Sequence, residues 1–165
     1  MTVDWGPITI GANGKFMQVF IENEAGSRRK NIYDERTLRY LGTVDVSASY
    51  PYPYGFVIDT VSGDDDAVDC FVLTAEPLVA GTTLECDPIG LLEQVEDGEI
   101  DHKVLAVPAG GYATIDEAVI ADLKEFIFTV FADVPNKRME IGRLLGRDAA
   151  ERYVRQCRAA LGSAR

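Results

Sequence analysis

Short segments rich in Val, Ile, Phe and Tyr, each bounded by Gly, Pro or Asp, follow one another through residues 15–108. Such segments are typical of β-strands, and their regular spacing is typical of a small antiparallel barrel. The strands are expected at Phe16–Glu22, Val44–Ser49, Phe56–Thr60, Cys70–Thr74, Thr83–Cys86 and Lys103–Val107.

The pattern becomes helical after residue 115. From about Asp116 to Phe131, apolar residues recur with a helical period at Val119, Leu123, Phe126, Ile127 and Val130. A second helix is expected to begin with a capping box of Asp148 and Glu151 and to end before Gly162. Its apolar stripe consists of Ala150, Tyr153, Val154, Cys157 and Leu161. We predict one α+β domain over residues 1–165, a small closed antiparallel β-barrel (OB-like) with two C-terminal helices packed on it.

The scarcity of histidine and cysteine excludes several classes of site. His102 is the single histidine, so a His-rich zinc site and an H-E-x-x-H helix are both absent. The three cysteines, Cys70, Cys86 and Cys157, are widely spaced and are expected to be reduced core residues. Catalysis would therefore depend on carboxylates, lysines and tyrosines.

The net charge of −11, from 27 acidic and 16 basic residues, disfavours binding to nucleic acid or to an anionic membrane. No apolar run approaches the ~18 residues that cross a bilayer. The first fifteen residues contain no secretory signal pattern, which predicts a cytoplasmic protein. An anionic substrate could bind only where metal ions or local lysines reverse the sign of the surface.

The densest group of carboxylates is Gly63-Asp64-Asp65-Asp66-Ala67-Val68-Asp69-Cys70, which leads directly into an apolar strand. A solvated loop is one interpretation. Asp69, however, lies against the strand, where its carboxylate is partly desolvated, and like charges ~4 Å apart repel by roughly 4 kcal/mol. A divalent cation would relieve that repulsion. Oxygen ligands without histidine or thiolate indicate Mg²⁺, with Mn²⁺ as an alternative.

A second acidic run, Glu96-Asp97-Gly98-Glu99-Ile100-Asp101-His102-Lys103, also leads into a strand. Alternation along the strand puts Asp101 and Lys103 on one face and His102 on the other. An exposed ion pair is one interpretation of Asp101 and Lys103. The alternative is that together they hold a metal ion and a phosphate oxygen.

Five segments in the same order and spacing resemble the family I inorganic pyrophosphatases. The central one is the pattern D-x-D-x-(aliphatic)-D at Asp64, Asp66 and Asp69. The other four are Phe20–Glu22 with Gly26–Lys30, Tyr50–Phe56, Pro88–Leu91, and Gly98–Lys103. The resemblance covers roughly residues 20–108 and implies Mg²⁺-dependent hydrolysis of diphosphate to two phosphates.

The resemblance also implies a role for each matching residue. Asp64, Asp69 and Asp101 would bind the activating metals, with Glu96 standing where the family usually has Asp, and Glu22 would help to hold a further metal. Asp66 would accept the proton of a metal-bound water. The phosphate oxygens would be held by Lys30, Tyr54 and Lys103. Bacterial members are commonly homohexamers, so the resemblance implies a homo-oligomer.

The sequence departs from the family pattern mainly where the substrate is held. Ile32 replaces a Glu, Gly42 replaces a phosphate-binding Arg, Val130-Phe131 replace a Tyr-Lys pair, and Ala67 replaces a Pro. Each lost hydrogen bond to a charged group is worth ~1.5–3 kcal/mol, or about ten- to 150-fold. Arg28, Arg29 or Arg39 could compensate. Two alternatives follow: a hydrolase of a substituted, organic diphosphate, or a weakly active binding protein.

Overall fold

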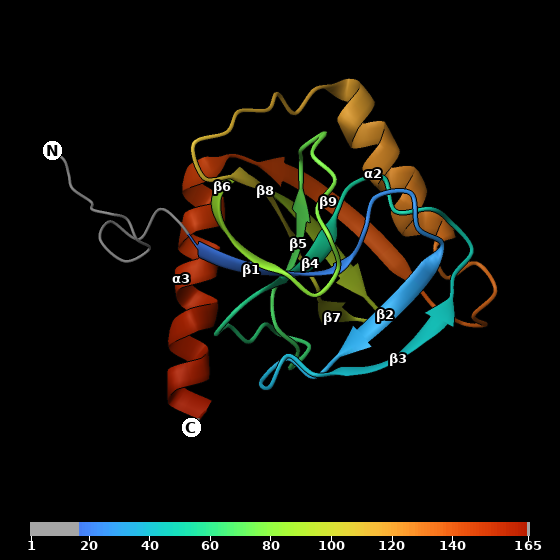
Figure 1. Ribbon diagram of the computed structural model, residues 1–165, viewed down its shortest axis with the longest axis horizontal. Helices are drawn as coiled ribbons and strands as arrows, with labels where there is room; N and C mark the ends of the chain where they lie inside the picture. The colour runs from blue at the N-terminus through green and yellow to red at the C-terminus, as the bar shows by residue number, and fades with distance from the viewer. Residues whose placement is uncertain (1–16, 165) are drawn as a thin grey trace, which may run out of the picture.

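The structure is a computed structural model that describes residues 17–164. Five strands close a barrel in the order β1 (Met17–Asn23), β4 (Tyr54–Val57), β5 (Asp69–Val72), β8 (Lys103–Pro108) and β6 (Thr83–Glu96), and β6 pairs with β1 to complete it. Figure 1 shows this barrel between the two helices. The predicted barrel and fold class are confirmed; Phe16, expected in the first strand, lies outside the described residues.

One strand pair differs from the expected antiparallel arrangement. β5 and β8 are parallel, with Asp69 opposite Lys103, so the barrel is mixed. The reason is the connection: after β5 the chain runs through the long strand β6 and returns as β8 between β5 and β6. This inserted strand brings the beginnings of β5 and β8 side by side.

Four strands lie outside or at the edge of the barrel, and the sequence pattern predicted them only in part. β2 (Arg29–Tyr33) and β3 (Tyr40–Asp45) form a separate hairpin, while β7 (Glu99–Ile100) and β9 (Met139–Leu145) pair with β6. β2 was expected only as a turn, because Arg29-Lys30-Asn31 lacks alternation of apolar residues. Similarly, the predicted strand Thr83–Cys86 is only the first part of β6.

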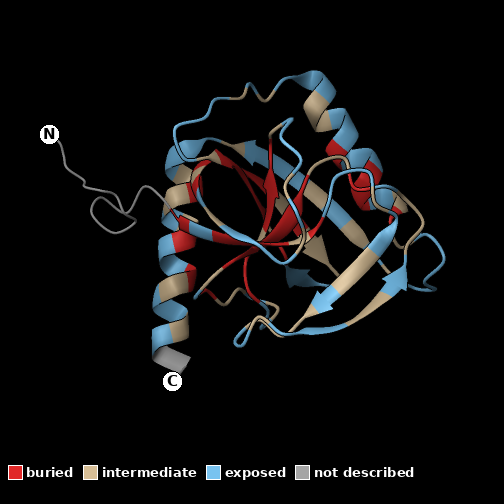
Figure 2. Cartoon of the chain, in the orientation of Figure 1, coloured by how far each residue is buried: buried red, intermediate tan, exposed pale blue. Residues whose placement is uncertain are grey.

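The barrel interior is filled by small and branched side chains. Val19, Ile21, Val57, Cys70 and Val72 are fully buried in one cluster, seen as the red strands of Figure 2. Gly55 allows β4 to approach β1, because a Cβ at this position would lie 1.7 Å from the carbonyl oxygen of Phe20. This core stabilises the barrel, whose strands and loops carry the polar residues predicted to form the site.

The helices cover the barrel on two sides (Figure 1). α2 (Glu117–Thr129) begins at the cap Asp116, whose Oδ1 accepts from the Val119 amide at 3.0 Å. It buries Leu123, Phe126 and Ile127, as predicted. No helix within residues 17–164 is long and apolar enough to span a bilayer.

α3 (Arg147–Ala164) differs at both ends from the prediction. The helix begins one residue before Asp148, and the Gly146 carbonyl accepts from the Ala150 amide, so Asp148 lies in the first turn instead of capping it. Gly162 lies inside the helix. The predicted apolar stripe is correct, since Ala150, Val154 and Cys157 are buried against the barrel core.

Candidate active site

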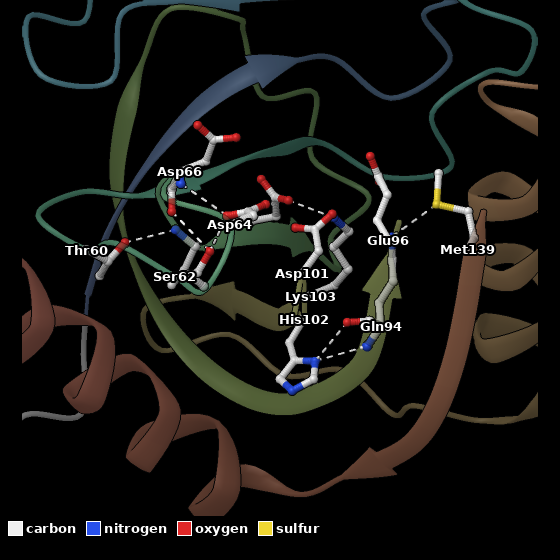
Figure 3. Close-up of polar contacts among 12 residues, drawn as sticks. Thr60, Ser62, Asp64, Asp66, Gln94, Glu96, Asp101, His102, Lys103 and Met139 are labelled. Carbon is white, nitrogen blue, oxygen red and sulfur yellow. Dashed lines mark hydrogen bonds and ion pairs between the residues drawn. The ribbon is translucent and has the colours of Figure 1, made fainter. Parts of the chain in front are cut away.

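A buried trio of polar side chains lies at the beginning of β5 and β8. Lys103 Nζ donates to Asp69 Oδ2 at 2.6 Å and to Asp101 Oδ2 at 3.0 Å (Figure 3). The parallel register that places Asp69 opposite Lys103 creates this contact. His102 points to the other face, as expected, where its Nδ1 meets the backbone of Gln94 and its ring packs on Tyr153.

Burial and mutual repulsion dominate the electrostatics of this trio. Burial raises the pKa of Asp101 to about 8, opposed by Lys103 and reinforced by Asp69. Burial also acts to raise the pKa of Asp69, but Lys103 and hydrogen bonds hold it below its ordinary value. Two carboxylates thus share one ammonium, and a further positive charge would be favourable here.

Asp64 organises the acidic loop. Its Oδ1 accepts from Ser62 Oγ at 2.5 Å and from the backbone N–H of Asp66 at 3.1 Å. Asp65 adopts a left-handed conformation with φ of 68°, which turns the chain between the two aspartates. Asp66 is exposed, and partial burial with the charges of Asp64 and Asp69 raises the pKa of its carboxyl group.

Two glutamates approach this loop from other elements. Glu22 on β1 has its pKa raised to about 8 by burial, an effect that Lys30 opposes and Asp69 reinforces. Glu35, in the turn of the β2–β3 hairpin, accepts from the Ala67 amide at 2.9 Å. Its pKa is raised to about 7, chiefly by burial, with contributions from Asp66 and Asp69. Sequence reasoning missed Glu35, because only the folded hairpin brings it to the loop.

Glu96 lies apart from the other carboxylates predicted to bind metal. Its Oε2 pairs with Lys137 Nζ at 2.8 Å. Figure 3 shows Glu96 beside Met139, on the far side of Lys103 from Asp64 and Asp101. Lys137 is a second residue that sequence reasoning did not single out.

The three predicted phosphate-binding residues surround one small cavity. Lys30, Tyr54 and Lys103 line a space of about 40 Å³ between the barrel and α2. Tyr54 is buried on Phe71, with ring centroids 4.8 Å apart, and Lys103 Nζ lies 5.9 Å from the Tyr54 ring centroid. Lys30 Nζ lies 5.9 Å from the Phe131 ring centroid. Two lysines therefore line the cavity beside aromatic rings, and the ammonium of Lys103 is paired with Asp69 and Asp101.

The donor set fits hard divalent cations. The acidic side chains gathered near Asp69 offer carboxylate oxygens, and burial, together with repulsion among these groups, raises the pKa values of Glu22, Glu35, Asp66 and Asp101. Within residues 17–164, no three His, Cys, Asp or Glu side chains are already arranged to hold one ion. Lys103 lies between Asp69 and Asp101, so metal binding would require side-chain rotation.

The comparison with known proteins agrees with this arrangement. The family model described as inorganic pyrophosphatase matches residues 19–161. The chain belongs to this family. An inorganic pyrophosphatase of Nanoarchaeum equitans is 33% identical over 149 residues, covering 83% of this chain and 92% of that protein. One from Geobacillus stearothermophilus is 33% identical over 152 residues, covering 87% and 92%.

A solved structure shows the same fold over the whole described chain. The crystal structure of inorganic pyrophosphatase from Thermus thermophilus has a TM-score of 0.83 and 25% identity, and the match covers 98% of this chain and 97% of that one.

The positions where this pyrophosphatase departs from the family pattern are apolar or open. Ile32 is exposed, and a Cβ at Gly42 would meet nothing within 4 Å. Val130 is buried, while the Phe131 ring lies between Lys30 and Lys137, 5.9 and 5.1 Å from their Nζ atoms. Lys137 Nζ thus lies close to Phe131, although it pairs with Glu96 at 2.8 Å.

Three arginines were candidates to replace the phosphate-binding Arg that is absent at Gly42. Each of them either contacts other groups or lies away from the cavity. Arg28 Nη2 donates to the Ser47 carbonyl at 2.9 Å. Arg29 pairs loosely with Asp45 at 3.8 Å, with both side chains largely exposed. Arg39 is exposed and is not among the residues that line the cavity. Compensation by these three residues finds no support in their contacts.

Glu35 provides a test of the carboxylate cluster. Gln in place of Glu35 keeps an acceptor for the Ala67 amide but removes the charge, so we expect unchanged stability and a several-fold weaker affinity for Mg²⁺. Ala in place of Glu35 removes both, and is expected to cost about 1 kcal/mol of stability as well. Thermal unfolding and the Mg²⁺ dependence of hydrolysis measure the two effects.

Asp65→Asn is the matched control, since it removes an exposed charge from the same loop and Asn tolerates the left-handed conformation. Equal loss of Mg²⁺ affinity in the Asp65 and Glu35 variants would show that only the net charge of the loop matters.

Proposed function

We propose that this chain hydrolyses inorganic diphosphate to two phosphates with the help of divalent cations, Mg²⁺ or alternatively Mn²⁺. The observation that carries the proposal is the trio of Asp69, Lys103 and Asp101 beside the Asp64–Asp66 loop, in a chain matched to the family over residues 19–161. Metal ions bound here would supply positive charge for the diphosphate and lower the pKa of water.

Asp64, Asp69, Asp101, Glu22 and Glu96 are the proposed metal ligands. For Glu96 this role requires its release from Lys137, with which it pairs at 2.8 Å. The remaining carboxylates converge from β1, β5, the acidic loop and the turn before β8. Carboxylates that converge from separate elements could hold several cations, and these cations would supply the positive charge that a diphosphate needs around it.

Asp66 is the proposed general base. Its side chain is exposed on an ordered loop, and its raised pKa makes it a better proton acceptor than an ordinary aspartate. Water attacks one phosphorus atom, its proton passes to Asp66, and the bond from that phosphorus to the bridging oxygen breaks. Lys30, Tyr54 and Lys103 hold phosphate oxygens and balance the charge that develops on the leaving phosphate.

A second candidate substrate is an organic diphosphate. Exposed Ile32 and Val44 stand on the same side of the β2–β3 hairpin as Lys30, and Gly42 leaves open space between the strands' side chains. An apolar substituent on the diphosphate would cover these side chains. The same assay decides between the substrates.

Phosphate release should be measured for diphosphate and for a panel of nucleotide and sugar diphosphates, with Mg²⁺ and with Mn²⁺. Turnover of diphosphate well above the panel supports the proposal. Turnover of an organic diphosphate alone selects the second candidate, and metal binding without any turnover contradicts both. A single-domain chain, a homo-oligomer such as a hexamer, and a cytoplasmic location complete the proposal.

A further inference from the structure

Gln94 on β6 carries a buried polar atom without a partner. The residue is only 2% exposed, and its side-chain Oε1 has no hydrogen-bond partner among the described residues. Its Nε2 reaches only Met139 Sδ, at 3.7 Å, and thioether sulfur is a weak acceptor. Leaving a buried amide unsatisfied disfavours the folded state by about 1–3 kcal/mol, so Gln94 needs a reason to be polar.

The backbone of Gln94 is held firmly in place. Its carbonyl accepts from the Asp101 amide at 2.9 Å, and its N–H lies 3.0 Å from His102 Nδ1. On the other side, β6 pairs Gln94 with Ile141 of β9. The main chain of Gln94 is therefore fixed next to the segment that carries Asp101 and Lys103, while the carboxamide can still turn about its last bond.

The unsatisfied carboxamide lines the cavity that Lys30, Tyr54 and Lys103 share. At about 40 Å³ the cavity accepts a water molecule or a phosphate oxygen, but not a whole diphosphate. Glu96 also lines it, but Lys137 neutralises that carboxylate from 2.8 Å. Lys30 and Lys103 are the ammonium groups that an anion would meet there, and cations bound by Asp69 and Asp101 would free Lys103 from these two carboxylates.

We propose that Gln94 binds substrate and product by donating a hydrogen bond from Nε2 to a phosphate oxygen that enters this cavity between Lys30 and Lys103. The two ends of a carboxamide have nearly the same shape, so a half-turn about its last bond exchanges Oε1 and Nε2. The exchanged amide then satisfies the phosphate, and its oxygen faces Met139. This inference rests on the proposed function, because it takes phosphate as the ligand.

Gln94→Met tests the inference, since it keeps the length of the side chain and removes the amide. We expect the KM for diphosphate, and the Kd for inorganic phosphate measured by calorimetry with Mg²⁺, to rise about tenfold. The thermal unfolding temperature of the free protein should stay the same or rise, because a buried unsatisfied group is lost. A role in folding alone predicts the opposite result: lower stability with unchanged affinity.

Gln18→Met is the matched control, because it makes the same exchange at an exposed position of β1 that does not line the cavity. Its KM and Kd should match those of the wild type. Gln94→Leu repeats the test if the Met variant does not fold. A Gln94 variant with unchanged KM and Kd would overturn the inference and assign the cavity to water.

The two proposals fail separately. If the wild-type protein hydrolyses diphosphate and Gln94→Met has unchanged affinities, the proposed function stands and the role of Gln94 is refuted. Wild-type protein that binds phosphate without hydrolysing diphosphate refutes the function, and the phosphate Kd of the variant still decides the role of Gln94. If the wild-type protein neither hydrolyses diphosphate nor binds phosphate, the proposed function and the role of Gln94 are both wrong.

Discussion

Asn in place of Asp66 is expected to lower kcat for diphosphate by about 10²–10⁴-fold, the usual contribution of a positioned general base. The loop should keep its shape, because its hydrogen bonds use the backbone of Asp66 and the side chains of Ser62 and Asp64. The amide is nearly the same size as the carboxylate but does not accept a proton. Steady-state kinetics at saturating Mg²⁺, together with the unfolding temperature, measures the effect.

Asp65→Asn serves as the control, since Asp65 is its exposed neighbour in the same loop and loses the same charge. We expect its kcat to remain within a few-fold of the wild type. If both variants lose activity equally, Asp66 acts only through loop charge, and the assignment of the base is wrong.

The barrel was predictable because its strands are apolar and short, a pattern that depends on local sequence alone. The hairpin strand β2 and the strand β9 were not, since Arg29-Lys30-Asn31 and Gly142-Arg143 are polar and gain their strand pairing only from partners elsewhere. The parallel pairing of β5 and β8 depends on where the chain returns after β6. No local pattern encodes that path.

The active site shows the same division. Asp101 and Lys103 are two apart where the chain enters β8, so alternation alone predicts their shared face, and Asp69 joins them through strand pairing. Glu35 and Lys137 arrive from a turn and from a loop, and no spacing rule connects either of them to Asp66 or Glu96. Gln94 carries a signal in the sequence only as a polar residue within an apolar strand, which the prediction of a shorter β6 overlooked.

Met in place of Lys103 is expected to have the largest effect on stability. Asp69 and Asp101 would remain buried without their ammonium, and breaking a buried ion pair in this way costs about 3–5 kcal/mol. For a chain of this size that corresponds to a fall of roughly 6–20 °C in unfolding temperature. Diphosphate hydrolysis should be lost as well, because Lys103 is a proposed phosphate ligand.

The loss should grow as the pH rises. Burial, together with repulsion from Asp69, already raises the pKa of Asp101 to about 8 in the presence of Lys103, and removal of the ammonium raises it further. A carboxyl group with a raised pKa in the folded state favours folding at low pH, and that advantage disappears as the pH rises through the folded-state pKa. The Lys103→Met protein should therefore lose more stability at pH 9 than at pH 6.

Divalent cations should reverse this effect if the two aspartates are metal ligands. Mg²⁺ or Mn²⁺ at the position of the missing ammonium would neutralise both carboxylates, so the cation should raise the unfolding temperature of Lys103→Met more than that of the wild type. Arg143→Met is the control: Arg143 is 75% exposed, its partner Glu93 is not a proposed metal ligand, and such a surface pair is worth about 1 kcal/mol or less. If the unfolding temperature of Lys103→Met is the same with the cation as with a chelator, Asp69 and Asp101 are not metal ligands. Lys103 is then their only counterion.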